Sequence, residues 1–326
     1  MTKLKTAEYA RKGHPDRVCD IISDAIVDEY IKQDPDSRVA VDVFGCHGII
    51  TVGGEVSSKA TVNIPKIVRS TYKEIGYDDE VGVQVNIIKQ SSEIQVHADE
   101  GAGDSGIVVG YATNETKEML PLEVVLAKRI CSRLDNLSWL KPDGKVQVTL
   151  NGKEIEKLVV SVHGDVSKKE ELRTILKNEF PHKELHLIVY EVGGFIADSG
   201  LTGRKNVLWY GPRVPTGGGA FAGKDATKVD RSGAYYARYL AIQALKKYNL
   251  KECLVELAFA IGKDKRVMTR IRGIDQDNKT TNITFHELED LGVAKMIEKL
   301  NLKKSIFKET SLRGHFGHRN FNWEMC

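Results

Sequence analysis

The sequence lacks any apolar stretch long enough to cross a membrane, and its first residues show no apolar signal segment. Its five cysteines are scattered and never in C-x-x-C spacing, which predicts reduced thiols instead of a disulfide framework. The formal net charge is only +3, so net charge indicates neither nucleic acid nor an anionic membrane as a partner. We therefore expect a soluble cytoplasmic protein with no nucleic-acid or membrane partner.

What the chain does contain is a recurring succession of predicted hairpins and amphipathic helices. Its 326 residues are enough for two or three packed units with a large buried core. Alternating hydrophobicity predicts one hairpin from strands 38–44 and 49–56, and another from strands 254–261 and 266–274. Few strands alternate with helices in uninterrupted β-α-β order. The pattern favours an α+β fold, with helices packed on mostly antiparallel sheets.

The segment Gly217–Ser232 carries the densest set of residues suited to ligand chemistry. Four of its first seven residues are glycines, so the backbone can approach a ligand closely. Lys224 and Lys228 follow, with Asp225 and Asp230 beside them, ahead of a run with helical periodicity. Amines and carboxylates on a flexible loop before a helix N-terminus are typical of a site for a polyanion and its metal ion.

Two local motifs suggest other nucleotide sites but lack the required context. Gly218–Lys224 fits the P-loop pattern G-x-x-x-x-G-K. However, Asp225 replaces the Ser or Thr that binds Mg²⁺, and the preceding segment is a poor buried strand. Gly101–Gly106 is a literal G-x-G-x-x-G, yet Ile107–Tyr111 after it is typical of a strand and not of the helix that a dinucleotide fold requires. An acidic glycine loop near a ligand explains this second motif better, and a plain surface loop remains the alternative for the first.

A histidine and an aspartate flank the predicted start of the first helix. Pro15 suits the first helical position, and apolar residues then recur on one face. His14 and Asp16 are therefore expected near free backbone N–H groups. The helix dipole alone favours Asp16 there, so a structural role stays open for it, whereas His14 is a poorer cap than serine and favours ligand contact. Glu55 at a strand end and Asp42 in an apolar run are further candidates for ligand or cation contact.

Four glycine-framed motifs follow one another along the chain, and together they resemble those of S-adenosylmethionine synthetase (methionine adenosyltransferase). They are Gly13-His14-Pro15-Asp16, Gly101–Asp104, Gly200–Lys205 and Gly217–Asp225. Each motif alone is a weak signal, but four in this order across most of the chain are specific to that family. The resemblance is strengthened by Gly110–Thr116, Lys228–Ser232 and Gly314–Gly317.

The resemblance implies three similar α+β units in a pseudo-threefold arrangement, for which we predict the boundaries 1–97, 98–186 and 187–326. It implies that methionine sulfur attacks C5′ of ATP in line and expels tripolyphosphate, which is then hydrolysed to phosphate and pyrophosphate. Because sulfur is already a good nucleophile, such an enzyme must mainly align the reactants and stabilise the leaving charge. Two Mg²⁺ ions per site and K⁺ are the expected cofactors. The family places its site between subunits, which implies a homodimer or a tetramer.

The resemblance also implies a role for individual residues. Catalysis through charge stabilisation is implied for His14, Lys145, Arg204, Lys224 and Lys228. Further contact with ATP is implied for Asp143, Val189, Tyr190, Asp198, Lys205, Ala220 and Ile261. In that set, Tyr190 would stack on adenine with Ile261 on the opposite face. Contact with methionine is implied for Glu55, Gln90, Asp104, Asp198 and Lys228. Contact with metal ions is implied for Asp16, Asp230 and Asp42.

The chain departs from the family pattern in several places. Asp42 stands where a glutamate usually helps to bind K⁺, and Arg17 and Lys12 replace a usual lysine and a usual acid. The segment between Gln90 and Gly101 is much shorter than the family's mobile loop, which can alter product release. Two alternatives stay open: a catalytically weakened homologue that regulates a full-length synthetase, and a generic P-loop kinase or ATPase.

Overall fold

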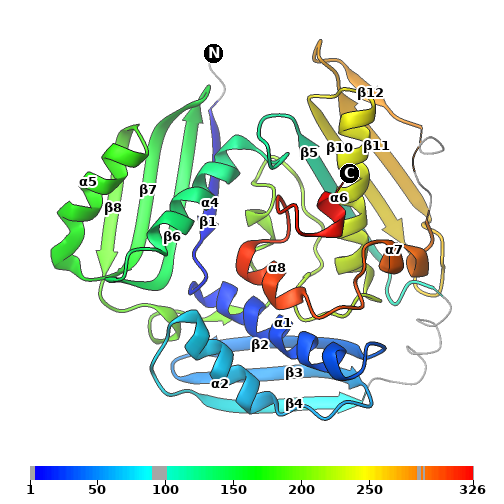
Figure 1. Cartoon of the computed structure of the whole chain (residues 1–326), viewed down its shortest axis with the longest axis horizontal. Coiled ribbons are helices and arrows are strands. Elements are labelled where there is room, and N and C mark those ends of the chain that lie inside the picture. Colours follow the sequence, from blue (N-terminus) through cyan, green and yellow to red (C-terminus); the bar gives the residue numbers. More distant parts are fainter. Residues whose placement is uncertain (1–3, 90–100, 285–287, 289–290, 326) are drawn as a thin grey trace.

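The computed structural model describes residues 4–89, 101–284, 288 and 291–325. It consists of three lobes around a central region, and each lobe pairs a four-stranded sheet with helices (Figure 1). The predicted α+β class, with three units of helices on mostly antiparallel sheets, is confirmed. Among the described helices, none is both long and apolar enough to span a membrane.

The first lobe contains the predicted 38–44 and 49–56 hairpin. Its strands, in order across the sheet, are β4 (Gly82–Lys89), β3 (Ile49–Ser57), β2 (Arg38–Cys46) and β9 (Gly200–Leu201). The helices α1 (Pro15–Gln33) and α2 (Ile64–Ile75) pack on it. The first helix begins at Pro15, as the sequence predicts, because proline has no N–H to satisfy at that position.

The other two lobes repeat this plan. The second sheet is β1 (Lys5–Ala10), β6 (Leu140–Asn151), β7 (Glu154–Gly164) and β8 (His182–Tyr190), with helices α4 (Leu122–Leu134) and α5 (Lys169–Glu179). The third sheet is β12 (Thr280–Asn282), β11 (Met268–Ile274), β10 (Glu252–Phe259) and β5 (Gly106–Thr113), with helices α6 (Val229–Lys247) and α7 (Val293–Lys299). The short helix α8 (Phe307–Arg313) lies at the centre and contacts α1 (Figure 1).

Each sheet takes one strand from a distant part of the chain. Strand β1 pairs with β6, β5 pairs with β10, and the two-residue β9 pairs with β2 through Phe44 and Leu201. The backbone hydrogen bonds within each sheet therefore join segments that are far apart in the sequence. The boundaries 1–97, 98–186 and 187–326 stay a prediction.

The helices cover only one face of each sheet, and in Figure 1 they lie in front of the strands. The helix-facing residues of β2, such as Val41 and Val43, are buried. Apolar side chains elsewhere on the sheets stay exposed: the exposed fraction is 45% for Phe44, 60% for Ile88, 61% for Ile107 and 42% for Ile188. We call the sheet faces turned away from the helices the open faces. Large exposed apolar patches mark surfaces for association.

Candidate active site

The first part of the site lies at the start of α1. His14 is the residue before the helix, and its Nδ1 accepts a hydrogen bond from the backbone N–H of Asp16 at 3.2 Å. The imidazole therefore caps the helix. The sequence did not predict this role, because histidine is a poorer helix cap than serine. Burial lowers the pKa of His14, Asp143 raises it and Lys205 lowers it further, so the net shift favours the neutral ring. Lys145 also lies near enough to lower this pKa.

Asp16 is buried and joins the first and third glycine motifs. Its carboxylate pairs with Lys205 Nζ at 2.8 Å and with Arg204 Nε at 3.2 Å. It also accepts the backbone N–H of Leu201 at 3.0 Å. The short strand β9 holds this loop against β2, which places both cations beside the helix start. Charges that are nearly two hundred residues apart in sequence are thus brought together.

The second lobe completes this cluster. Asp143 is buried and accepts the N–H of Gly194 at 2.9 Å. Burial and the neighbouring Asp143 raise the pKa of Tyr190, and its ring stacks on His163 with centroids 5.8 Å apart and planes 10° apart. Lys145 lies on β6, as Asp143 does, and its Nζ is 3.6 Å from the carboxylate of Glu8. We call the first group the residues His14, Asp16, Asp143, Lys145, Tyr190, Arg204 and Lys205.

The glycine-rich segment forms a second group of charges against β2. Lys224 pairs with Asp230 at 2.6 Å, and Lys228 pairs with Asp225 at 3.0 Å. Burial raises the pKa of Asp225, but Lys228 and hydrogen bonds outweigh this effect and leave the pKa lowered. Burial also raises the pKa of Asp42, and Lys224 opposes that shift. We call these five residues the second group.

Backbone contacts fix the second group to the first lobe. The carboxylate of Asp225 accepts the N–H of Val39 at 2.7 Å, and Lys224 forms an isolated bridge with Ala40. Ala40 lies opposite Glu55 on β3, so the predicted methionine contact Glu55 is on the same open face as Asp42. The P-loop interpretation finds no support here, since the residue after Lys224 is a buried carboxylate with protein partners.

The two groups are connected through contact between the loops that carry Arg204 and Lys224, and not through an ion pair among the described residues. A Cβ on Gly203 would come within 2.4 Å of the Cβ of Ala220, so the loops that carry Arg204 and Lys224 are in direct contact. Asn206 also donates to the carbonyl of Gly219 at 2.8 Å. Within the described part of the chain, no ion pair or hydrogen bond connects a charged side chain of one group to one of the other.

The remaining predicted residues lie at the edges of these groups. Asp104 is exposed and accepts the N–H of Ser105, whose hydroxyl accepts the N–H of Ile261 at 2.9 Å. Ile261 is exposed and Asp198 lies on an exposed loop, whereas Val189 is buried in the core. Gln90 lies outside the described residues. That all these residues contact ATP or methionine stays a prediction.

Sequence reasoning missed two buried residues that support the site. Arg231 on α6 pairs with Asp24 on α1, and its other terminal nitrogen donates to the carbonyl of Lys224 at 2.9 Å. Asp24 also accepts the N–H of Gly223 at 2.9 Å. A signal was available, because both charges fall within segments that are otherwise predicted to be buried helix. Charges in such positions need partners.

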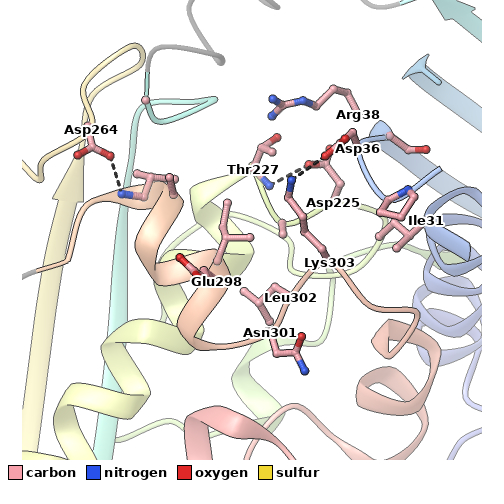
Figure 2. A pocket seen from close by; sticks show the side chains of 17 residues that line it. Ile31, Asp36, Arg38, Asp225, Thr227, Asp264, Glu298, Asn301, Leu302 and Lys303 are labelled. Carbon is pink, nitrogen blue, oxygen red and sulfur yellow. Dashed lines mark hydrogen bonds and ion pairs between the residues drawn. The ribbon is translucent and has the colours of Figure 1, made fainter. Parts of the chain in front are cut away.

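A cavity of about 580 Å³ is lined by Asp225 of the second group but by none of the other four residues of that group (Figure 2). Asp225 and Thr227 form part of its wall, opposite α7 and Leu302 (Figure 2). The ion pair between Asp36 and Lys303, 2.6 Å apart, lies at this cavity. None of the catalytic residues that we predict lines it. The predicted catalytic residues lie in the two charged groups and not at this cavity.

The structure is that of an α+β protein whose charged glycine loops lie together, and comparison with known proteins gives its family. Models of the N-terminal, central and C-terminal domains of S-adenosylmethionine synthetase match residues 2–99, 99–193 and 192–325. The chain therefore belongs to the S-adenosylmethionine synthetase family. Such enzymes are methionine adenosyltransferases, with ATP and methionine as substrates, and they use divalent metal ions.

Curated relatives agree over nearly the whole chain. The S-adenosylmethionine synthase of Thermus thermophilus is 38% identical, with 99% of this chain and 95% of the relative covered. Those of Aquifex aeolicus and Mesoplasma florum are 37% and 35% identical, again over 99% of this chain and over 96% and 97% of their own lengths. The recognition made from the four motifs is confirmed.

Proposed function

We propose that this methionine adenosyltransferase joins methionine sulfur to C5′ of ATP in one in-line step, expels tripolyphosphate and then hydrolyses it to phosphate and pyrophosphate. The observation that carries the proposal is that Arg204 and Lys205 pair with Asp16 beside His14, while Lys145, from a third segment, lies near enough to His14 to lower its pKa. Preorganised cations of this kind stabilise charge that develops on a leaving polyphosphate. No base is needed, because the thioether carries no proton to remove.

The tautomer of His14 supports its position at the leaving oxygen. Its Nδ1 accepts the N–H of Asp16, so in the neutral ring the proton resides on Nε2. The lowered pKa keeps the ring neutral near physiological pH. Nε2–H can then donate to the oxygen that links C5′ to the triphosphate. Arg204 and Lys205 would neutralise the phosphates beside it, with Lys224 and Lys228 approaching from the second group.

The donor set fits Mg²⁺, for which we propose Asp16 and Asp230 as ligands. In the described ranges no group of three or more His, Cys, Asp or Glu side chains lies together to form a cage. Mg²⁺ usually takes one or two carboxylates and completes its shell with water and substrate phosphates. When bound, two such ions would neutralise phosphate charge. We propose Asp42 for K⁺, because burial raises its pKa and an adjacent cation would compensate its charge.

We propose that two subunits share each active site, with the first group of one facing the second group of the other. Asp42 and Glu55 lie on an open face together with the exposed Phe44, and Tyr190 lies on another with the exposed Ile188. A second copy laid on these faces would bury the apolar side chains and cover both groups. This supports a homodimer as the minimal active form, alone or within a tetramer. The free cysteines of the described residues support a cytoplasmic location.

The reaction is tested by incubating the protein with ATP, methionine and Mg²⁺ and identifying the products by mass spectrometry. We expect S-adenosylmethionine, phosphate and pyrophosphate in equal amounts. Formation of ADP would contradict the mechanism. No product from the isolated protein, with activity only in a hetero-oligomer, would instead support the regulatory homologue.

Subunit sharing is tested by mixing two inactive variants, Arg204→Ala and Lys224→Met, after reversible dissociation. In random mixing, half of the dimers are mixed, and each of these has one intact site. About one quarter of the wild-type activity should therefore return, since a C₂ interface presents the same two half-sites in each dimer. No return of activity, with mixed dimers verified by native mass spectrometry, would show that each site lies within one subunit.

A further inference from the structure

A second cavity, of about 290 Å³, lies on the helix side of the molecule between the start of α1, α4 and the C-terminal segment. We call it the rear cavity. Its wall includes Tyr9, Arg17, Lys128, Arg313 and His318. No residue of either charged group lines it. The helices α4 and α8 lie near the start of α1 (Figure 1). The rear cavity therefore differs from both the active site and the cavity of Figure 2.

The lining of the rear cavity is strongly cationic. Besides Arg17, Lys128 and Arg313, it includes Arg11 and Lys12. The one carboxylate among its lining residues, Asp135, is already paired with Arg11 at 2.8 Å. Arg313 is paired with Glu309 at 3.1 Å, which leaves Lys12, Arg17 and Lys128 as the lining cations without an ion-pair partner among the described residues. Positive charge that is not balanced in a concave site attracts anions.

Two buried polar atoms in the wall have no hydrogen-bond partner. Tyr9 is 5% exposed and Arg17 is 1% exposed, yet neither Tyr9 Oη nor Arg17 Nε is paired. The two terminal nitrogens of Arg17 are satisfied by the carbonyls of Ala10, Ser311 and Leu312. The guanidinium carbon lies 5.3 Å from the centre of the Tyr9 ring, over its face. Buried unpaired donors are costly, so an acceptor placed here would be stabilising.

Lys128 supplies a third donor that responds to an anion. Its Nζ lies 2.6 Å from His318 Nε2 and 3.4 Å from the carbonyl of Phe316. Burial and then Arg17 lower the pKa of Lys128 to about 7, although Glu324 and Glu118 act in the opposite direction. An anion beside this amine would favour its protonated form.

We propose that the rear cavity binds a small tetrahedral oxyanion, of the phosphate or sulfate class, between Tyr9, Arg17 and Lys128. The oxyanion accepts hydrogen bonds from the tyrosine hydroxyl, the guanidinium Nε–H and the ammonium group. The cavity is several times the volume of one water molecule, which suits an ion of this size. The site does not depend on the proposed mechanism of adenosyl transfer.

The test is isothermal titration of the whole protein with sodium sulfate at constant ionic strength. Tyr9→Phe is the informative variant, because it removes only a hydroxyl that has no partner in the protein. We expect it to weaken sulfate binding about tenfold or more, since hydrogen bonds to charged groups contribute the most. Its thermal unfolding without sulfate should match that of the wild type. Lys128→Met should weaken binding in the same way.

Two controls separate the rear cavity from other anion sites. Tyr210 has a buried hydroxyl without a hydrogen-bond partner but does not line the cavity, so Tyr210→Phe should bind sulfate like the wild type. Lys224→Met weakens any anion binding in the active site. It should retain the sulfate binding in the rear cavity that Tyr9→Phe weakens. Equal sulfate affinity in the wild type, Tyr9→Phe and Lys128→Met would overturn the proposal.

A pH series gives an independent readout, because sulfate stays a dianion near neutral pH. Protonation of Lys128 should strengthen sulfate binding as the pH falls through about 7, the pKa of that amine. In Lys128→Met this dependence should disappear. A wild-type affinity that is constant across that range would contradict the role of Lys128. Phosphate titrated in the same way shows which of the two anions the cavity prefers.

Discussion

Asp24 and Arg231 form an ion pair that is buried completely, with 2.6 Å between the guanidinium and each carboxylate oxygen. The pair joins α1 to α6. It also orients the loop before α6, since Asp24 accepts the N–H of Gly223 and Arg231 donates to the carbonyl of Lys224. Ser311 completes the shell by donating to Asp24 at 2.6 Å.

Arg231→Met should destabilise the protein strongly, because it leaves the carboxylate of Asp24 buried without its cation. Breaking one side of a buried pair costs about 3–5 kcal/mol. The free energy of unfolding from urea titration measures this cost. Lys303→Met removes one member of an exposed pair with Asp36 and should cost about 0–1 kcal/mol. Similar costs for both variants would contradict the importance of burial.

Gly219→Ala should reduce activity much more than Gly218→Ala. A Cβ on Gly219 would come within 2.2 Å of the carboxyl carbon of Asp230, whereas a Cβ on Gly218 meets no atom within 4 Å. The first substitution must displace Asp230 and thereby break its ion pair with Lys224. Steady-state kinetics of both variants provides the measurement. Equal kcat values would mean that the position of Asp230 does not matter for turnover.

Lys224→Met should lower kcat by more than about tenfold, since charge-stabilising donors in such sites contribute roughly 2.7–4 kcal/mol to stabilisation of the transition state. Loss of this amine also leaves Asp230 without the cation that pairs with it. Lys183→Met, at an exposed pair with Glu156 far from both groups in the fold, is the matched control. A Lys224→Met enzyme within twofold of the wild type would remove this residue from the mechanism.

Stability should fall as the pH rises through neutrality, in part because of Asp20. Burial raises the pKa of Asp20 to about 7, although Gly203 N–H and Arg17 oppose the shift. The folded state therefore holds a proton on Asp20 that the unfolded state releases near pH 4. The contribution of Asp20 to the stability of the folded protein falls as the pH rises to the folded pKa of this group. Between pH 6 and pH 8 the loss is about 1.4 kcal/mol.

Asp20→Asn tests this assignment, because the amide stays neutral and keeps an oxygen to accept the N–H of Gly203. Urea unfolding at both pH values should show a decline that is smaller than in the wild type by about 1.4 kcal/mol. An unchanged decline would assign the pH dependence to other groups, such as Asp28, whose pKa burial also raises to about 7.

Much of the local structure was predictable, because hydrophobic periodicity is a local property. The hairpin predicted from strands 38–44 and 49–56 and the helix that begins at Pro15 are where the pattern places them. The strand after Gly101–Gly106, which argued against a dinucleotide fold, is present as β5. Its partner β10 was not predictable, since sequence patterns do not specify which distant strand supplies the hydrogen bonds.

By itself the sequence determined the residue types of the site, the order of the four motifs and hence the family, because these are properties of the chain read from one end to the other. Only the tertiary structure decided which charges pair. Asp16 meets Arg204 and Lys205 because two residues of β9 pair with the edge of β2. A strand of two residues is too short to show a hydrophobic period in the sequence. Ion pairs depend on distance in space, and that distance is set by strand exchange between lobes far apart in sequence.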